Sequence, residues 1–187
     1  MNKIRVIPRL DIKSSNIIKG IHLEELKSDG VTYIANGIGN TKGTSDNIIK
    51  LIERYLHYGF KFPSIIHPSA EISKSSSLGD GSMVMENAVI KTQAKVGKFC
   101  LINALEVVSH GCSVGDYSHL SLGSKIGGQV EIGSNVFLGI NMSVNQNIKI
   151  ESNTVVGSGS VIIRNIPKNS LVVGNPGKII KKRLNEN

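Results

Sequence analysis

Aliphatic residues recur at every sixth position through the last two thirds of the chain. From Ile66 to Ile162, every residue at this spacing is isoleucine, leucine or valine. A second set lies four residues after each member of the first, runs from Ala70 to Ile166, and consists mostly of small or apolar residues. This period is neither the 3.6 residues of a helix nor the simple alternation of a half-buried strand.

The period of six predicts a parallel β-helix of hexapeptide repeats. One large and one small inward residue per hexad suit a narrow triangular coil of about eighteen residues, in which residues i and i+18 stack. Glycines such as Gly97 and Gly115 often follow the aliphatic residue. They suit turns that need a positive φ or that have no room for a side chain.

The period is absent before Ile66, where the sequence predicts an α/β segment. "VTYIANGIGN" predicts a strand that runs into a glycine turn, and "SDNIIKLIERYLHYGF" predicts a helix that Gly59 ends. The apolar residues expected on that helix are Ile48, Ile49, Ile52 and Leu56. We therefore expect a mainly β protein, with a short, incomplete α/β segment over residues 1–62 and a β-helix with its C-terminal cap over residues 63–187.

Composition narrows the classes of function. The net charge of +8 favours anionic partners such as the phosphates of a cofactor or nucleotide. Aromatic residues make up only 4% and no nucleic-acid motif is present, so nucleic-acid binding is not expected. No apolar run is long enough to span a membrane, so membrane insertion is not expected either. Two cysteines favour a reduced, cytoplasmic setting.

The stretch "VVSHGCSVGDYSH" holds the candidate chemistry, because His110, Cys112 and His119 lie close together in it. The hexad frame turns Cys112 inward with Cys100, which indicates two small core residues rather than a nucleophile. Zinc normally takes three or four protein ligands, and residues 120–187 hold no third histidine, so no metal is expected. His110 should point outward, either as a general base or as a solvated surface residue.

The motifs "NGIGN", "GFKFPSIIHPSA" and "VVGNPGKIIKK", together with the hexads, resemble the bacterial sugar acetyltransferases of the left-handed β-helix superfamily. The resemblance is to the sialic-acid O-acetyltransferase and UDP-amino-sugar N-acetyltransferase type. It implies a left-handed coil, a homotrimer with active sites between subunits, and acetyl-CoA as cosubstrate.

The resemblance also assigns roles to individual residues. His110 matches the general base, and the backbone N–H of Gly128 matches the donor to the thioester oxygen. His119, Ile140, Ser158 and Lys178 match or neighbour positions that contact the cofactor. Gly39 and Asn40 match a turn that contacts the nucleotide-linked sugar.

Two departures from the family pattern stand out. The usual N-terminal glycine-rich loop is missing, and residues 1–28 instead resemble the start of the cyclase subunit of imidazole glycerol phosphate synthase. Asp11 matches a catalytic aspartate there, but one strand cannot rebuild a barrel site, so we expect it to be inert. The base is also flanked by Ser109 and Gly111 in place of the usual acids.

Glu106 is the one charged residue in the inward set. A buried carboxylate is costly without a partner, so the strand must distort or a polar partner must be present. We hypothesise that Glu106 replaces the missing acid beside His110.

The expected function is acetyl-CoA-dependent acetylation of an amino group on a nucleotide-linked sugar, for surface glycan synthesis. Two alternatives remain open. One is O-acetylation of a free sialic-type sugar, which would tolerate the loss of the nucleotide loop. The other is a trimeric β-helix scaffold with little or no activity.

Overall fold

The computed structural model describes residues 3–7, 12–13, 16–17, 27–36 and 46–182. The chain divides into two compact units. The first comprises residues 1–39 and 45–63, and the second comprises residues 40–44 and 64–187. Gly39 and Asn40, the residues predicted to contact the sugar nucleotide, and Asp11 lie outside the described residues.

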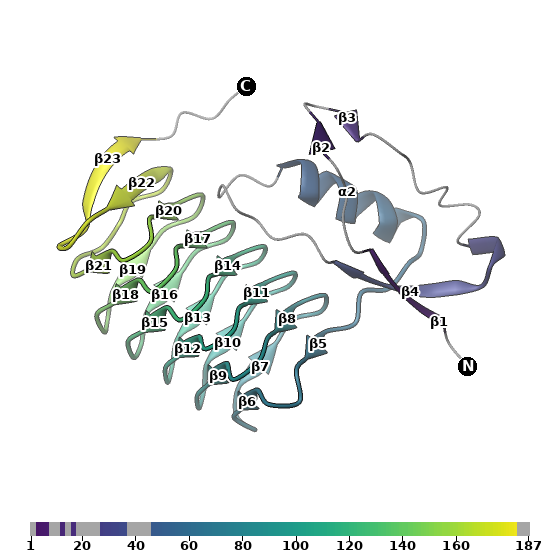
Figure 1. Ribbon diagram of the computed structural model, residues 1–187, viewed down its shortest axis with the longest axis horizontal. Coiled ribbons are helices and arrows are strands. Elements are labelled where there is room, and N and C mark those ends of the chain that lie inside the picture. The colour runs from purple at the N-terminus through teal and green to yellow at the C-terminus, as the bar shows by residue number, and fades with distance from the viewer. Residues whose placement is uncertain (1–2, 8–11, 14–15, 18–26, 37–45, 183–187) are drawn as a thin grey trace. The chain divides into compact units, whose positions relative to one another are not determined.

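The first unit contains a parallel strand pair and helix α2 (Asp46–His57), as Figure 1 shows. β1 (Lys3–Ile7) pairs in parallel with β4 (Val31–Asn36), while β2 (Ile12–Lys13) and β3 (Asn16–Ile17) form a short antiparallel pair. Helix α2 follows these strands in the chain. The segment that resembles a barrel enzyme therefore contributes a strand to this unit.

Helix α2 forms where the sequence predicts it, but its buried face differs in part from the prediction. Ile52 is buried as expected, whereas Leu56 is 43% exposed and Tyr55 is buried. Tyr55 contacts Phe60 with ring centroids 5.9 Å apart, so the chain after the helix folds back onto it. Gly59 adopts a φ of 83°, which allows the helix to end and the chain to reverse.

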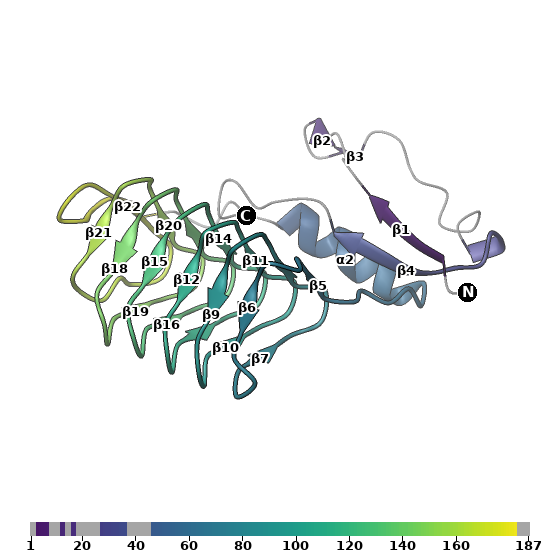
Figure 2. The same ribbon diagram turned by 60° about the horizontal axis from the view of Figure 1, so that its bottom comes forward.

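The second unit is a β-helix whose three sides are parallel sheets, as the turned view in Figure 2 shows. Each turn of the β-helix is called a coil. The five-stranded side contains β7 (Ser77–Leu78), β10 (Lys95–Val96), β13 (Ser113–Val114), β16 (Glu131–Ile132) and β19 (Lys149–Ile150). The six-stranded side contains β6 (Glu71–Ile72), β9 (Val89–Ile90), β12 (Val107–Val108), β15 (Lys125–Ile126), β18 (Ser143–Val144) and β21 (Val161–Ile162). The eight-stranded side contains β5 (Ile65–Ile66), β8 (Met83–Val84), β11 (Leu101–Ile102), β14 (His119–Leu120), β17 (Phe137–Leu138), β20 (Val155–Val156), β22 (Ser170–Val173) and β23 (Lys178–Lys182).

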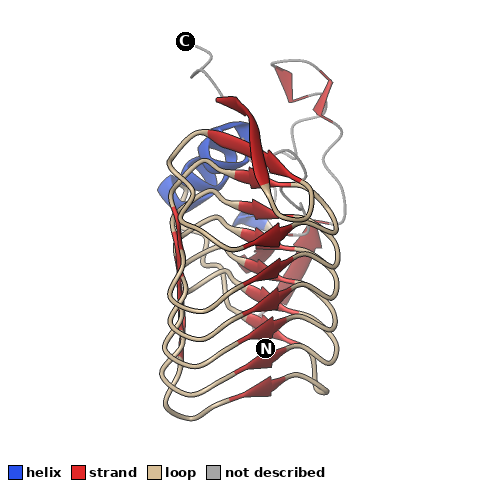
Figure 3. Cartoon of the chain, turned by 90° about the vertical axis from the view of Figure 1, so that its left-hand side faces the viewer, coloured by secondary structure: helices blue, strands red, loops and turns tan. Residues whose placement is uncertain are grey.

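From β5 to β21, each strand pairs in register with the strand eighteen residues away, so the coils stack directly on one another (Figure 3). The predicted parallel β-helix is confirmed. From Val84 to Ile162 the aliphatic set is buried, and so is the second inward set from Ser82 to Ile166. Ile66 is 49% exposed because it belongs to the first strand of this stack.

Three corners join the sides, and we name them by the sheet they follow. Corner A follows the six-stranded sheet (residues 109–112 and 127–130 in two successive coils). Corner B follows the five-stranded sheet (residues 115–118 and 133–136). Corner C follows the eight-stranded sheet (residues 103–106, 121–124, 139–142 and 157–160).

Every corner from residue 81 to residue 159 has one residue with positive φ, again with a period of six. Asparagine and glycine hold most of these positions, as the left-handed conformation favours. The glycines that follow the aliphatic residues are a different set and have another cause. A Cβ on Gly115 would lie 2.5 Å from the backbone of Gly133, so these glycines are required by the close approach of the next coil.

The last strands close the C-terminal end of the stack. β22 pairs in parallel with β20 and antiparallel with β23. Gly177 lies in the turn between β22 and β23, and a Cβ there would lie 2.7 Å from the side chain of Ile162. The turn therefore sits directly on the last coil of the core.

Candidate active site

His110 lies at corner A, between β12 and β13, and its side chain is exposed. Its ring rests against the backbone of Gly128, one coil further along. A Cβ built on Gly128 would lie 2.5 Å from His110 Cε1 and 2.6 Å from Nε2. The pair that the resemblance implies, eighteen residues apart in the sequence, is therefore brought together in the structure.

The nearest atoms to a side chain at residue 128 would be those of the His110 ring, and the backbone conformation of Gly128 does not call for glycine. Gly128 is absent from the residues with positive φ. Within the described part of the chain, its N–H donates to no acceptor. A backbone donor without a partner in the described structure thus lies beside an exposed imidazole, which is the arrangement that general-base catalysis with an oxyanion-binding donor requires.

Hydrogen bonds between coils hold this corner in place. The Gln129 N–H donates to the His110 carbonyl at 2.9 Å, and the Gly111 N–H donates to the Thr92 carbonyl at 3.0 Å. Gly111 has a φ of 66°, which a glycine adopts without strain. The backbone on both sides of the imidazole is thus tied to the coils below and above it.

Glu106 turns inward and finds a polar partner that the sequence analysis missed. Its side chain is fully buried, and the Ser124 hydroxyl donates to its Oε2 atom in a short hydrogen bond. The spacing of eighteen residues between Glu106 and Ser124 is the signal that identifies this pair. Burial raises the pKa of the Glu106 carboxyl to about 8, opposed by the Ser124 hydroxyl and the Lys125 charge.

Glu106 belongs to corner C and His110 to corner A, with β12 between them. The two described side chains make no contact with each other, and the support of His110 by Glu106 stays a prediction. Ser109 and Gly111 flank the imidazole without a carboxyl group.

Cys100 and Cys112 are core residues, as the hexad frame predicts. Both are 1% exposed. The thiol of Cys112 donates to the Gly127 carbonyl at 3.0 Å, and burial raises the pKa of both thiols, that of Cys100 to about 12. A thiol held neutral in this way is a poor nucleophile.

His119 lies on a different side of the coil from His110. It begins β14 in the eight-stranded sheet, between Leu101 and Phe137 of the adjacent strands. Its ring meets Phe137 edge-to-face at a centroid distance of 5.2 Å, and its side chain is buried. Within one chain, His110 and His119 are therefore separated by the whole strand β13.

The remaining predicted cofactor residues lie at corner C and near the C-terminus. Ile140 is 47% exposed, and its N–H donates to the hydroxyl of Ser158, one coil above. Lys178 is exposed at the start of β23. One chain thus presents the His110 imidazole and the Gly128 N–H at corner A, and the predicted cofactor residues elsewhere.

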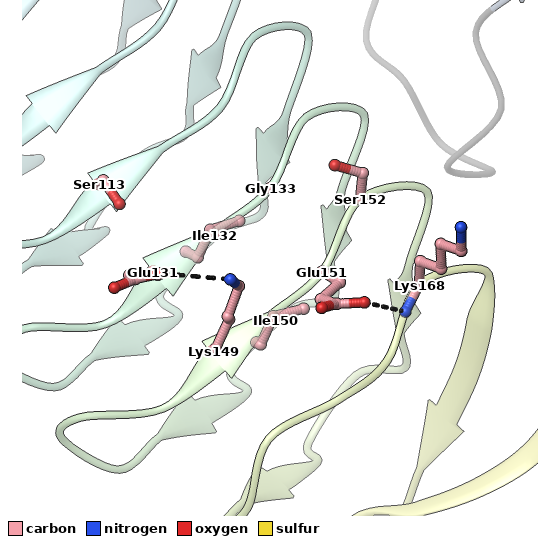
Figure 4. A pocket seen from close by; sticks show the side chains of 9 residues that line it. All are labelled: Ser113, Glu131, Ile132, Gly133, Lys149, Ile150, Glu151, Ser152 and Lys168. Atoms are coloured by element: carbon pink, nitrogen blue, oxygen red, sulfur yellow. Dashed lines mark hydrogen bonds and ion pairs between the residues drawn. The ribbon is translucent and has the colours of Figure 1, made fainter.

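A cavity of about 340 Å³ lies on the five-stranded side (Figure 4). Lys149 lies 3.7 Å from Glu131, and the Glu151 carboxylate accepts the backbone N–H of Lys168. Its lining contains none of the predicted site residues. Among the described residues, no group of three His, Cys, Asp or Glu side chains is placed to hold a metal ion, and no helix is long and apolar enough to cross a membrane.

No family model matches the chain, but several solved structures are similar to it. One is PerB from Caulobacter crescentus, a perosamine N-acetyltransferase, in complex with CoA and GDP-perosamine. The two share 33% identity over 85% of this chain and 75% of that chain, with a TM-score of 0.80. Another is the acetyltransferase domain of PglB from Neisseria gonorrhoeae FA1090 in complex with acetyl coenzyme A, with 26% identity over 91% and 84% and a TM-score of 0.78. WeeI from Acinetobacter baumannii AYE shares the fold, with 17% identity over 79% and 70% and a TM-score of 0.58.

Proposed function

We propose that this chain, which belongs to the hexapeptide-repeat β-helix sugar acetyltransferases, moves an acetyl group from acetyl-CoA to an amino group of a nucleotide-linked sugar. The product would serve the synthesis of a surface glycan. The similarity to a perosamine enzyme that was crystallised with CoA and GDP-perosamine supports both the donor and the class of acceptor. We place the reaction in the cytoplasm, in line with the two unpaired cysteines.

In the proposed mechanism, the His110 imidazole takes a proton from the amine as its nitrogen attacks the thioester carbonyl. A C–N bond forms, and the carbonyl oxygen becomes an oxyanion that accepts a hydrogen bond from the Gly128 N–H. Collapse of this intermediate breaks the C–S bond. The thiolate of CoA then leaves and is protonated by the imidazolium.

The observation that carries the proposal is the contact of the His110 ring with Gly128. A side chain at residue 128 would occupy the space of the imidazole, and the N–H of Gly128 lies at the same place. This contact favours the hypothesis that His110 is catalytic over the hypothesis that the protein is an inactive scaffold.

We propose further that the active site forms between copies of a homotrimer. The base lies at corner A, whereas Ile140 and Ser158 lie at corner C of the same chain, on the other edge of the six-stranded side. A second copy that brings its corner C to this corner A would complete the groove for acetyl-CoA. His119 and Lys178 would contact the cofactor there, and Gly39 and Asn40 the sugar nucleotide.

O-acetylation of a free sialic-type sugar is a second candidate, because residues 1–28 do not carry the usual glycine-rich loop. The two candidates differ in the acceptor and use the same base and donor. A panel of nucleotide-linked amino sugars and free sialic acids separates them.

The test is the turnover of the His110→Ala variant, assayed through the release of free CoA thiol with acetyl-CoA and the acceptor panel. We expect a loss of about 10²-fold or more. The matched control is His67→Ala, because His67 is another exposed corner histidine of the coil. Turnover of His110→Ala close to that of the control would rule out the proposed mechanism.

A further inference from the structure

In the proposed cofactor groove, a serine hydroxyl already accepts a hydrogen bond from a backbone N–H. Ser158 Oγ accepts the Ile140 N–H at 3.2 Å. Both residues are exposed at corner C, on the outside of the β-helix. In the free protein a side chain of the next coil already accepts this N–H, so a ligand that binds the N–H must displace the hydroxyl.

The same arrangement recurs at corner B, which shows how it is built. There the Ser134 N–H donates to Ser152 Oγ at 3.0 Å. In both places a glycine comes just before the donor: a Cβ on Gly133 would lie 2.5 Å from the Ser152 nitrogen, and one on Gly139 would lie 2.4 Å from the Ser158 nitrogen. The close approach that the glycine allows brings the serine over the N–H of the coil below.

We propose that Ser158 competes with acyl-CoA for the Ile140 N–H. The inference rests on the proposed function, in which corner C forms one wall of the groove for the cofactor. The pantetheine arm of CoA carries two amide carbonyls, and a carbonyl that binds the Ile140 N–H must displace the Ser158 hydroxyl. Binding then exchanges one hydrogen bond for another and gains little from this donor.

The expected consequence is a lower affinity for acetyl-CoA and for CoA alike, because the substrate and the product have the same pantetheine arm. Removal of the Ser158 hydroxyl should tighten the binding of both. A net hydrogen bond changes affinity by about fivefold. Ser158 is thus a positioning residue that favours the release of CoA after transfer, and its loss should lower KM for acetyl-CoA and slow turnover once product release limits the rate.

The experiment measures CoA binding to the full chain by isothermal titration calorimetry for the wild type, Ser158→Ala and Ser152→Ala. Ser152→Ala loses an equivalent hydroxyl-to-amide contact at corner B and controls for the loss of a bond between coils. We expect Kd to fall about fivefold in Ser158→Ala and to stay unchanged in Ser152→Ala. Ser158→Thr retains a hydroxyl and should keep the affinity of the wild type.

Two results would overturn the inference. Equal affinity in wild type and Ser158→Ala would mean that the hydroxyl does not compete, and weaker binding in Ser158→Ala would mean that it is a ligand of CoA. Failure of the proposed function gives a separate result, namely that wild-type protein binds neither CoA nor acetyl-CoA. The titration of the wild type therefore tests the function before the variants test the role of Ser158.

Discussion

The stability of the coil should fall as the pH rises, because of Glu106. Burial raises the pKa of this carboxyl from its ordinary 4.5 to about 8. The folded protein therefore binds the proton more tightly than the unfolded chain does. The resulting stabilisation is fully present below about pH 4.5 and is lost as the pH rises through about 8.

The size of the effect follows from the same pKa. A shift of one unit in pKa corresponds to about 1.4 kcal/mol, so complete ionisation of Glu106 lowers the free energy of unfolding by on the order of 5 kcal/mol. Between pH 5.5 and pH 8 the free energy of unfolding should fall by about 3 kcal/mol. Since domains are commonly stable by only about 5–15 kcal/mol, a change of this size is readily measured.

The assay is urea denaturation followed by circular dichroism at several pH values from 5.5 to 9. Glu106→Gln keeps the shape of the side chain but cannot ionise, so its stability should lack this component of the pH dependence. Glu131→Gln is the matched control, because Glu131 is an exposed glutamate on the outer face of the β-helix. Parallel stability curves for wild type and Glu106→Gln would refute the reasoning.

Two further substitutions test the site and the corners. Gly128→Ala places a Cβ in the space of the His110 ring and should lower turnover at least about tenfold by displacing the imidazole. The affinity for CoA, measured by calorimetry, should stay the same. Normal turnover would contradict the contact between the ring and residue 128. Gln93→Asn replaces an exposed residue at a φ of 57° with one that tolerates the left-handed conformation. It should raise the free energy of unfolding in urea by about 0.5–1 kcal/mol, and a lower value would show that the corner does not select for this conformation.

The β-helix could be predicted because the period of six leaves few alternatives. Once Val96, Val114 and Ile132 are aligned at eighteen residues, the direction of every side chain between them is fixed, including the inward turn of Cys112. The approach of His110 to Gly128 followed from the same spacing. These features all follow from the six-residue length of the repeat and the eighteen-residue length of the coil.

Other features depend on contacts that the repeat does not encode. The repeat did not show which of two reasons applied to the glycines that directly follow the aliphatic residues. In the structure these glycines face the next coil, and the residues with positive φ lie two positions later. The helical pattern assigned Leu56 to the buried face of α2, but the aromatic contact of Tyr55 with Phe60 rotates the buried surface toward Tyr55. The hydrogen-bond partner of Glu106 could have been predicted from the repeat, because Ser124 lies eighteen residues later in the same inward set.

The stacked register also limits how such a protein can change in length during evolution. Loss or gain of a single residue within the coil would turn the aliphatic row outward in every later repeat, whereas eighteen residues can be added or removed as a module. A module inserted after Gly128 would leave the His110–Gly128 pair intact but would move Ile140, Ser158 and Lys178 one coil further from it. Only a module added before His110 keeps these residues at their present distance from the proposed base.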